Sequence, residues 1–303
     1  MEIKYLEHNE IDKAKWDLCI NQAINRLPYA FSWYLDVVSP NWHALVSDDY
    51  KFVFPLTWRN KMGFNYLYQP LFTQQLGIFS SLPVSFAVSN DFLNAIPSKF
   101  KLIEINLNSF NPAAGNKFVA SKRLNFEIDL SLSYEEIRKF YSDNQKRNIN
   151  KAKKNELKIN QPDISEVISL FKNDRGLKVE RMKNESFELL RRLYSALKQK
   201  GISYIRGVSD GSQTICGGIF IQTEYRIIFL FSGNTVIGKS SGAMSFLIDS
   251  VIQENSNKKI ILDFEGSNDL GLARYYSSFG SIEHVYLHLK KNTLPFPVRL
   301  FKR

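Results

Sequence analysis

The sequence has 303 residues, of which 44% are hydrophobic and 14% aromatic. This apolar content is enough for a packed core and excludes a chain that is disordered throughout. No apolar run approaches the roughly 20 residues of a membrane-spanning helix, and the N-terminal residues lack the apolar stretch of a signal peptide. We therefore expect a cytoplasmic protein. The two cysteines, Cys19 and Cys216, have no metal-like spacing, so we expect no metal site.

The formal net charge of +10 lies entirely in the second part of the chain. Residues 1–120 carry 10 basic and 10 acidic residues, whereas residues 121–303 carry 30 basic and 20 acidic residues. Such asymmetry indicates that the second part meets a polyanion or a phosphate-bearing ligand. The alternative is a solvated, lysine-rich surface.

The first part of the chain alternates helical and strand-like patterns. Three strand-like runs in a row, with turns at 48–49 and 61–63, indicate an antiparallel meander. Pro55 places its run at a sheet edge or a bulge. In chain order we predict helices at 11–24 and 32–38, strands at 42–47, 51–59 and 64–70, a helix at 84–96 and a strand at 100–108. The turn-rich stretch 108–116 is the predicted domain break.

The second part repeats this order after additional helices. We predict helices at 134–155 (interrupted near Ser142), 166–176 and 185–201. Three strands follow within 202–234, then a helix at 241–255, a strand at 259–264, a helix at 268–278 and a strand at 284–291.

Both parts therefore show three strands, a helix and a strand, as an internal duplication would produce. A doubly wound nucleotide-binding fold requires helices between successive parallel strands, and 202–234 leaves no room for them. We predict an α+β protein with mixed, largely antiparallel sheets and two tandem domains, residues 1–120 and 121–303.

The order of elements in the second part resembles the GNAT acyltransferases. In that superfamily the fourth strand leads into a loop and a helix N-terminus that hold the donor's pyrophosphate. The equivalent loop here is TVIGKSSGAM, in which two glycines permit close approach of a ligand and a lysine adds positive charge. The predicted donor-binding residues are Gly238, Lys239, Ser240, Ser241, Gly242 and Ala243. The alternative is that the serines cap a helix and Gly242 serves packing.

The chain as a whole resembles the Fem family, aminoacyltransferases that build peptidoglycan cross-bridges. The resemblance is carried by FSWYLDVV (31–38), YSDNQKRNINKAKKNEL (141–157) and LDFEGSNDLGLARYYSSFGS (262–281). It implies two GNAT-like domains, the first degenerate and facing the acceptor, the second holding the donor. It also implies no tightly bound cofactor, with aminoacyl-tRNA or acyl-CoA as co-substrate and an amine acceptor such as a muropeptide.

Arg147, Lys151 and Lys154 fall at i, i+4 and i+7, on one face of a predicted helix. A tRNA acceptor stem, a UDP-linked precursor or coenzyme A would each offer phosphates to this stripe. The alternative is an exposed helix solubilised by lysine.

Asp263 and Glu265 stand at the tip of an apolar strand. Side chains alternate along a strand, so we expect both carboxylates on one side, where partial burial would raise their pKa values. Either could take the proton that an attacking amine must lose. The alternative is that they stabilise the turn. Tyr275, in the following helix, is predicted to face the site.

In the first domain the stretch 66–79 offers uncharged hydrogen-bonding groups suited to a peptide or sugar acceptor. The predicted acceptor-binding residues are Trp33, Tyr68, Gln69, Gln74 and Gln75, against the alternative of aromatic core packing.

We predict transfer of an acyl or aminoacyl group to an amine of a cell-envelope acceptor. A coenzyme-A-dependent N-acyltransferase for a small amine or amino sugar is one alternative, and a non-catalytic tRNA- or polyanion-binding module is another.

Overall fold

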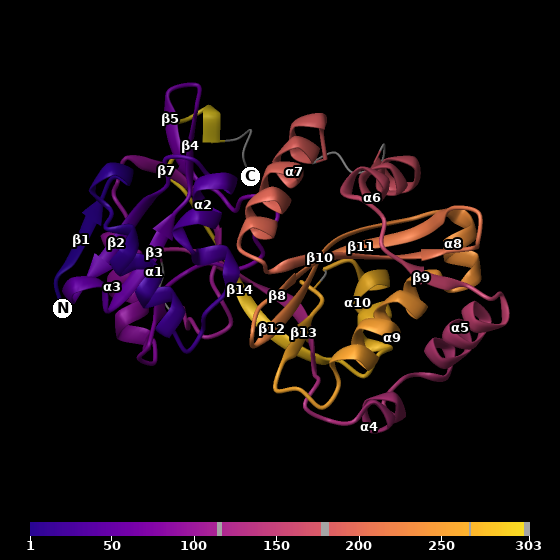
Figure 1. Cartoon of the computed structure of the whole chain (residues 1–303). Coiled ribbons are helices and arrows are strands. Elements are labelled where there is room, and N and C mark those ends of the chain that lie inside the picture. Colours follow the sequence, from indigo (N-terminus) through magenta and orange to yellow (C-terminus); the bar gives the residue numbers. More distant parts are fainter. Residues whose placement is uncertain (114–116, 177–181, 267, 300–303) are drawn as a thin grey trace. The chain divides into compact units, whose positions relative to one another are not determined.

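The computed structural model describes residues 1–113, 117–176, 182–266 and 268–299, shown as a ribbon in Figure 1. The chain divides by contacts into unit 1, Met1–Arg123 with Val285–Arg303, and unit 2, Leu124–His284. Our predicted boundary at residue 120 gave all of 121–303 to the second domain, whereas the contacts group 285–303 with unit 1. Within the described ranges, every helix is too short or too polar to cross a bilayer.

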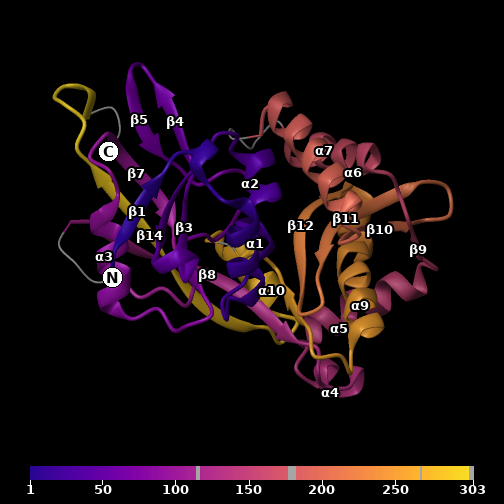
Figure 2. The ribbon, with the colours of Figure 1, turned by 60° about the vertical axis from the view of Figure 1, so that its left-hand side comes forward.

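Unit 1 contains two groups of paired strands. One is an antiparallel sheet in the order β1-β2-β3-β6, and the other follows the order β4-β5-β7-β14, in which only β5 and β7 are parallel. Strands β4 and β5 form a hairpin (Figure 2). The elements are β1 Ile3–Leu6, α1 Lys13–Gln22, α2 Ser32–Val38, β2 His43–Ser47, β3 Phe52–Leu56, β4 Trp58–Lys61, β5 Phe64–Leu67, β6 Phe79–Ser80, α3 Phe86–Ala95 and β7 Phe100–Asn106.

Unit 2 is one mixed sheet in the order β8-β13-β12-β11-β10-β9 with helices on both faces. Helix α6 packs on β11 and β12, and α9 packs on β10 and β11 from the opposite face (Figure 1). The elements are α4 Tyr134–Lys139, α5 Asp143–Lys154, β9 Lys158–Asn160, α6 Ile164–Phe171, α7 Asn184–Gln199, β10 Ser203–Ser209, β11 Thr214–Gln222, β12 Arg226–Asn234, α8 Val236–Ser241, α9 Ala243–Asn255, β13 Ile261–Asp263 and α10 Leu270–Ser277. A π-helical turn, Lys172–Gly176, follows α6.

The two units share a motif in which a hairpin is followed by a helix and then by a strand parallel to the hairpin's second strand. In unit 1 this is β4, β5, α3 and β7; in unit 2 it is β11, β12, the helices α8 and α9, and β13. A helical crossover is the usual way to join parallel neighbours. The predicted α+β class and the mixed, largely antiparallel sheets are confirmed.

Two strands cross the division between the units, and each pairs through the half that belongs to the same unit as its partner strand. Strand β8, Val119–Asp129, leaves unit 1 and pairs antiparallel with β13 of unit 2. Strand β14, Ile282–Asn292, leaves unit 2 and pairs antiparallel with β7 of unit 1. Our sequence analysis did not predict β8, because its first half carries the adjacent basic residues Lys122 and Arg123 and lies mostly in solvent.

Two predicted elements are divided in the structure. The run 51–59 is split at Thr57 into β3 and β4, which belong to different groups of strands. Strand β3 lies between β2 and β6 rather than at an edge, but β6 pairs only with Phe52 and Val53, so Pro55 pairs with β2 alone. The helix predicted at 241–255 is preceded by α8, and left-handed Gly242 (φ +81°) separates α8 from α9. The predicted interruption at Ser142 is confirmed, since Ser142 caps α5.

Candidate functional site

The central strands of unit 2 diverge from each other. Strand β13 pairs with only the first three residues of β12, from Arg226 to Ile228. Beyond that point β12 continues to Asn234, and a bulge opposite Ile219 and Phe220 bends it further. The space between the diverging strands is therefore not filled by strand pairing.

A cavity of about 620 Å³ occupies this divergence, and all of its lining residues in the described ranges belong to unit 2. Its walls come from β12, α6 with the turn after it, the junction of α8 and α9, the turn after β13, helix α10 and one residue of α5. Aromatic rings dominate the lining, contributed by Phe171, Phe229, Phe231, Phe264, Tyr275 and Tyr276. This is the size and mixed character of a pocket for a small molecule or for the end of a larger one.

The structure separates the two carboxylates that we expected on one side. Strand β13 ends at Asp263, and Glu265 has a left-handed backbone with φ +56°, so the alternation of a strand does not extend to it. Asp263 is 1% exposed and does not line the cavity, whereas Glu265 does. A non-glycine residue in this conformation costs about 1 kcal/mol, so the surroundings must hold it.

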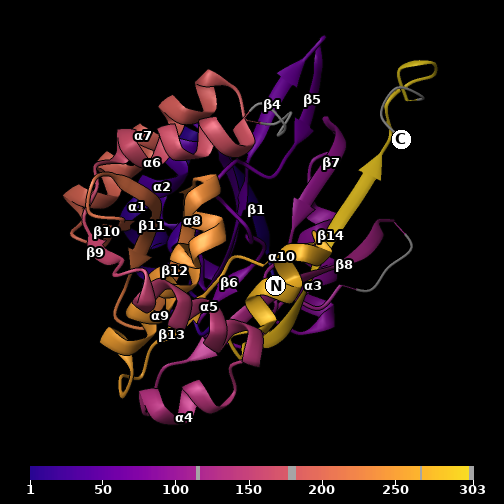
Figure 3. The ribbon, with the colours of Figure 1, turned by 90° about the vertical axis from the view of Figure 1, so that its right-hand side faces the viewer.

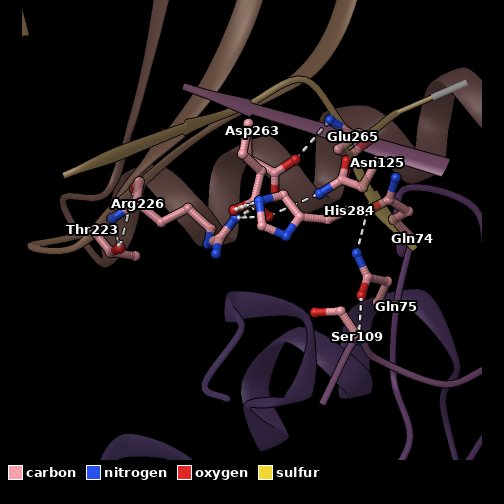
Figure 4. A network of polar contacts seen from close by, with 10 residues as sticks. Gln74, Gln75, Ser109, Asn125, Thr223, Arg226, Asp263, Glu265 and His284 are labelled. Atoms are coloured by element: carbon pink, nitrogen blue, oxygen red, sulfur yellow. Dashed lines mark hydrogen bonds and ion pairs between the residues drawn. The ribbon is translucent and has the colours of Figure 1, made fainter. Parts of the chain in front are cut away.

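Asp263 holds the turn that carries Glu265. Its Oδ1 accepts the backbone N–H of Glu265 over 2.8 Å, and its Oδ2 lies 2.7 Å from Arg226 Nη1 (Figure 4). The same Nη1 lies 2.7 Å from Glu127 Oε1. Burial raises the pKa of Asp263, and the attraction of Arg226 opposes that shift. Burial alone would lower the pKa of Arg226, but the two carboxylates raise it overall.

Two further groups complete this cluster. Asn125 Nδ2 donates to Glu127 Oε1 over 3.0 Å, and His284 Nε2 lies 3.7 Å from Glu127 Oε2 (Figure 4). Beside the turn, Gly266 is irreplaceable, since a Cβ there would lie 1.9 Å from the Leu124 carbonyl oxygen.

Tyr275 lines the cavity, as predicted for a residue that faces the site. Its hydroxyl lies 3.3 Å from Ser245 Oγ, which also lines the cavity. Burial raises the pKa of Tyr275, so its phenol stays protonated at neutral pH. At neutral pH the Tyr275 hydroxyl is therefore available to donate a hydrogen bond at the cavity wall.

The two glycines of the predicted donor loop contact protein backbone. A Cβ on Gly238 would lie 2.5 Å from the Ile215 carbonyl oxygen, and one on Gly242 would lie 2.3 Å from the Asn148 carbonyl oxygen. Both residues also line the cavity. Their lack of a side chain is thus required for packing, the alternative that we left open for Gly242.

Of the remaining residues of that loop, one lines the cavity and three do not. Lys239 lines the cavity and pairs with Asp174, another lining residue. Ser240 and Ser241 donate to the carbonyls of Ile237 and Gly238 within their own helix. Ala243 is fully buried and, like both serines, is not among the lining residues.

Among the residues that the structure describes, the ionisable lining of the cavity is acidic on balance. Asp174, Glu265 and Asp269 contribute three carboxylates, and Lys239 contributes one ammonium group. Such a lining favours a ligand with a cationic group in the cavity over an anionic ligand. We did not predict this from the sequence, because Asp174 and Lys239 lie 65 positions apart.

Helix α5 turns its basic stripe to solvent. Arg147, Lys151 and Lys154 are exposed, whereas Gln145, Ile149 and Ala152 are buried. Helix α5 packs beside α8 and α9 (Figure 3). Asn148 lines the cavity and stands between the two faces, about 60° around the helix from Lys151. The stripe therefore borders the cavity without entering it. Asn148 is a cavity residue that our sequence analysis missed.

In unit 1 the predicted acceptor-binding amides hold the chain itself. Gln69 accepts from the Asn106 N–H and donates to the Thr73 carbonyl. Gln75 accepts from the Ser109 N–H and donates to Gln74 (Figure 4).

The aromatic members of that predicted set also contact their own unit. Tyr68 stacks under Arg59, with 4.2 Å between the guanidinium carbon and the ring centre, and Trp33 stacks on Phe31. Acceptor binding by Trp33, Tyr68, Gln69, Gln74 and Gln75 stays a prediction.

The divergence after β5 and β7 is filled by the chain in unit 1. Leu76 donates to the Asn106 carbonyl over 3.0 Å and accepts from the Asn108 N–H over 2.8 Å, so residues 68–76 return along the end of β7. The equivalent divergence in unit 2 holds the cavity.

No family model matches this sequence, and no curated protein matches it. Solved structures do match along almost the whole chain. FemX has a TM-score of 0.65 at 10% identity, covering 95% of this chain and 97% of its own. The C-terminal domain of a putative lysylphosphatidylglycerol synthetase from Agrobacterium fabrum has a TM-score of 0.58 at 8% identity, covering 96% and 94%.

A tandem GNAT protein from the clavulanic acid biosynthesis pathway has a TM-score of 0.54 at 8% identity, covering 97% of this chain and 99% of its own. At such low identities the likeness is one of fold. The diverging strands, the repeated hairpin–helix–strand motif and these matches lead to one conclusion: the chain has the tandem GNAT-like fold found in FemX.

Proposed function

We propose that this protein is an acyltransferase that moves an acyl or aminoacyl group from an activated donor to an amine. The observation that carries the proposal is the cavity between the diverging strands β12 and β13, with Glu265 and Tyr275 both on its wall. The fold shared with FemX and with the tandem GNAT protein supports this reaction class.

The two side chains suit the two proton transfers that the reaction needs. The amine nitrogen attacks the carbonyl carbon of an ester or thioester, and Glu265 takes the proton that the nitrogen loses. The bond from that carbon to oxygen or sulfur then breaks, and the phenol of Tyr275 protonates the departing atom. The products are an amide and an alcohol or thiol.

The charges favour an aminoacyl donor. The ammonium group of an aminoacyl ester matches the acidic lining formed by Asp174, Glu265 and Asp269. A phosphate-rich carrier such as tRNA would lie outside the cavity, along the basic face of α5. Of the predicted donor-binding residues, Gly238, Lys239 and Gly242 would contact the donor from the cavity wall, whereas Ser240, Ser241 and Ala243 would support it from behind.

The proposed acceptor is an amine of a cell-envelope molecule, of which a peptidoglycan precursor is one example. The resemblance to the Fem family and the fold shared with FemX support an amine acceptor, whereas the name of the putative lysylphosphatidylglycerol synthetase supports a cell-envelope lipid as acceptor of an aminoacyl group. The fold alone does not select among such acceptors.

A coenzyme-A-dependent N-acyltransferase is the second candidate, favoured by the fold shared with the tandem GNAT protein. In that case the diphosphate of coenzyme A must displace Asp174 from Lys239. A non-catalytic polyanion-binding module is the third, and it would use the face of α5 alone.

A single screen separates these candidates. The protein is mixed in turn with acetyl-CoA, a long-chain acyl-CoA, uncharged tRNA, aminoacyl-tRNA and UDP-linked muropeptides, and its melting temperature is measured. Binders are then tested for transfer of a radiolabelled acyl group to amines. We expect stabilisation by tRNA and transfer from aminoacyl-tRNA. Stabilisation by acyl-CoA with transfer supports the second candidate, and tRNA binding without transfer from any donor contradicts both enzymatic proposals.

A further inference from the structure

The buried side of the cavity wall contains a charged clamp that the reaction chemistry does not use directly. It consists of Arg226 on β12, Asp263 at the end of β13 and Glu127 on β8, three neighbouring strands. Both ion-pair distances are 2.7 Å, and the side chains are 15%, 1% and 15% exposed. Buried charges are costly unless they are paired, so this cluster needs a reason.

Its position suggests that reason. Arg226 is the first residue of β12 and pairs in register with Ile261, while Ile228 pairs with Asp263, the last point before the two strands diverge. The clamp therefore fixes the end of β13 against β12 where the cavity begins. The next residues of the chain, Phe264 to Gly266, form the cavity wall.

The two carboxylate oxygens of Asp263 accept hydrogen bonds from two different donors. Oδ2 accepts from Arg226, and Oδ1 accepts the backbone N–H of Glu265. The second bond fixes the backbone of Glu265 in its left-handed conformation, φ +56°. A residue held in a sparsely populated backbone conformation at a cavity wall indicates that the orientation of its side chain is important for function.

We propose that Asp263 and Arg226 are positioning residues: through the Glu265 N–H they hold the turn that presents the Glu265 carboxylate to the cavity. This assigns Asp263 a role different from the general base that we considered from the sequence, and it rests on the proposed function of Glu265. Neither positioning residue is among the lining residues of the cavity.

Asp263→Asn is the direct test, since an amide has only one acceptor oxygen. It cannot accept from both Arg226 and the Glu265 N–H, so one of the two bonds is lost while size and shape are kept. Asp249→Asn is the matched control. Asp249 is also buried, at 2% exposed, accepts a hydrogen bond from Tyr134, and is not among the lining residues of the cavity.

The first measurement is transfer from the donor found in the screen. We expect Asp263→Asn to lower kcat by about 10- to 100-fold with KM nearly unchanged. We expect the same direction for Glu265→Gln, since a lost general base costs about this much or more. In the double variant we expect kcat within about threefold of Glu265→Gln alone, because groups that act as a unit are not additive. Asp249→Asn should leave kcat and KM unchanged. Additive losses, or an unchanged kcat in Asp263→Asn, would overturn the proposal.

The second measurement needs no substrate. Glu265→Gly relieves the left-handed backbone, so we expect it to raise the melting temperature of the wild-type protein by about 2 °C. In the Asp263→Asn background we expect no such rise, because the turn has already relaxed. The same rise in both backgrounds would contradict the clamp.

The two measurements test the proposed acyltransferase function and the positioning role of Asp263 separately. If the wild-type protein transfers no acyl group, the proposed function fails, and the stability coupling still decides whether Asp263 holds the turn. If Asp263→Asn does not fold, Arg226→Lys replaces it in both measurements, because a single ammonium group cannot hold the two carboxylates in the geometry of a guanidinium. For Arg226→Lys we expect the same fall in kcat and the same loss of the rise in melting temperature.

Discussion

Gly242 lies with its Cα directly against the backbone of Asn148. A Cβ built on Gly242 would lie 2.3 Å from the Asn148 carbonyl oxygen and 3.0 Å from its carbonyl carbon. Helix α5 therefore packs on the junction of α8 and α9 backbone to backbone. This contact fixes Asn148 at the cavity wall and sets the basic face of α5 beside the cavity.

Replacing Gly242 by alanine should destabilise unit 2 whichever donor the protein uses. The left-handed backbone, φ +81°, costs an alanine about 1 kcal/mol, and the clash with Asn148 adds more, so we expect a loss of about 2–4 kcal/mol. Gly211→Ala is the control, because Gly211 is also left-handed (φ +96°) but has open space around it. We expect it to lose only about 1 kcal/mol. Urea denaturation measures both, and equal losses would contradict the contact.

Charge reversal on α5 should weaken binding of the donor's carrier without changing stability. Lys151 and Lys154 are exposed and belong to no ion pair among the described residues, so Lys151→Glu with Lys154→Glu should unfold at an unchanged temperature. If both contact phosphates, the slope of log affinity against log salt should fall by about 2. Affinity for tRNA is measured between low and physiological salt.

The control for this reversal is Lys198→Glu, at an exposed lysine of α7. It should leave the salt slope unchanged. An equal loss of affinity in this control would show that the effect comes from net charge and not from the face of α5.

Tyr275→Phe should slow transfer while leaving binding intact. The variant removes the phenol that protonates the departing atom, so we expect kcat to fall by about 100-fold with KM nearly constant. The hydroxyl's contact with Ser245 is long, at 3.3 Å, so the free energy of unfolding should change by about 1 kcal/mol or less. Steady-state kinetics measures the first effect and urea denaturation the second. A raised KM with an unchanged kcat would instead assign Tyr275 to substrate binding.

Unit 2 should lose stability steeply above about pH 10. Burial raises the pKa of Tyr134 to about 12, and burial also raises the pKa values of Tyr141, Tyr204 and Tyr275 above their ordinary value near 10. Below pH 10 both the folded and the unfolded chain keep these protons, so their contribution to stability is complete. Above pH 10 the unfolded chain releases protons that the folded chain retains, and the contribution is lost.

Urea denaturation between pH 7 and pH 11 measures this dependence. Tyr134→Phe should reduce its slope above pH 10, because position 134 no longer titrates there. A slope that is unchanged in this variant would show that Tyr134 titrates normally in the folded protein.

The sequence determined the elements that depend on local patterns. Ser142 predicted the break between α4 and α5, and Gly63 and Met62 predicted the hairpin turn between β4 and β5, because capping and turn formation need only neighbouring residues. The order of elements in the two parts, and the resemblance to the Fem family, predicted the tandem GNAT-like fold that the structural matches confirm. The stripe on α5 also followed from helical spacing, and the structure leaves it exposed.

The candidate site was decided by tertiary structure. Asp263 and Glu265 look equivalent along the chain, but Arg226 and Glu127, distant in sequence, draw the first into the interior and leave the second at the cavity wall. Gly238 and Gly242 look like ligand-binding glycines, yet their neighbours are the carbonyls of Ile215 and Asn148. The physical reason is that burial and ion pairing depend on which strands and helices become neighbours in space. Spacing along the chain determines which residues share a face of a helix or strand. Only tertiary packing determines whether that face contacts solvent, a cavity or other parts of the protein.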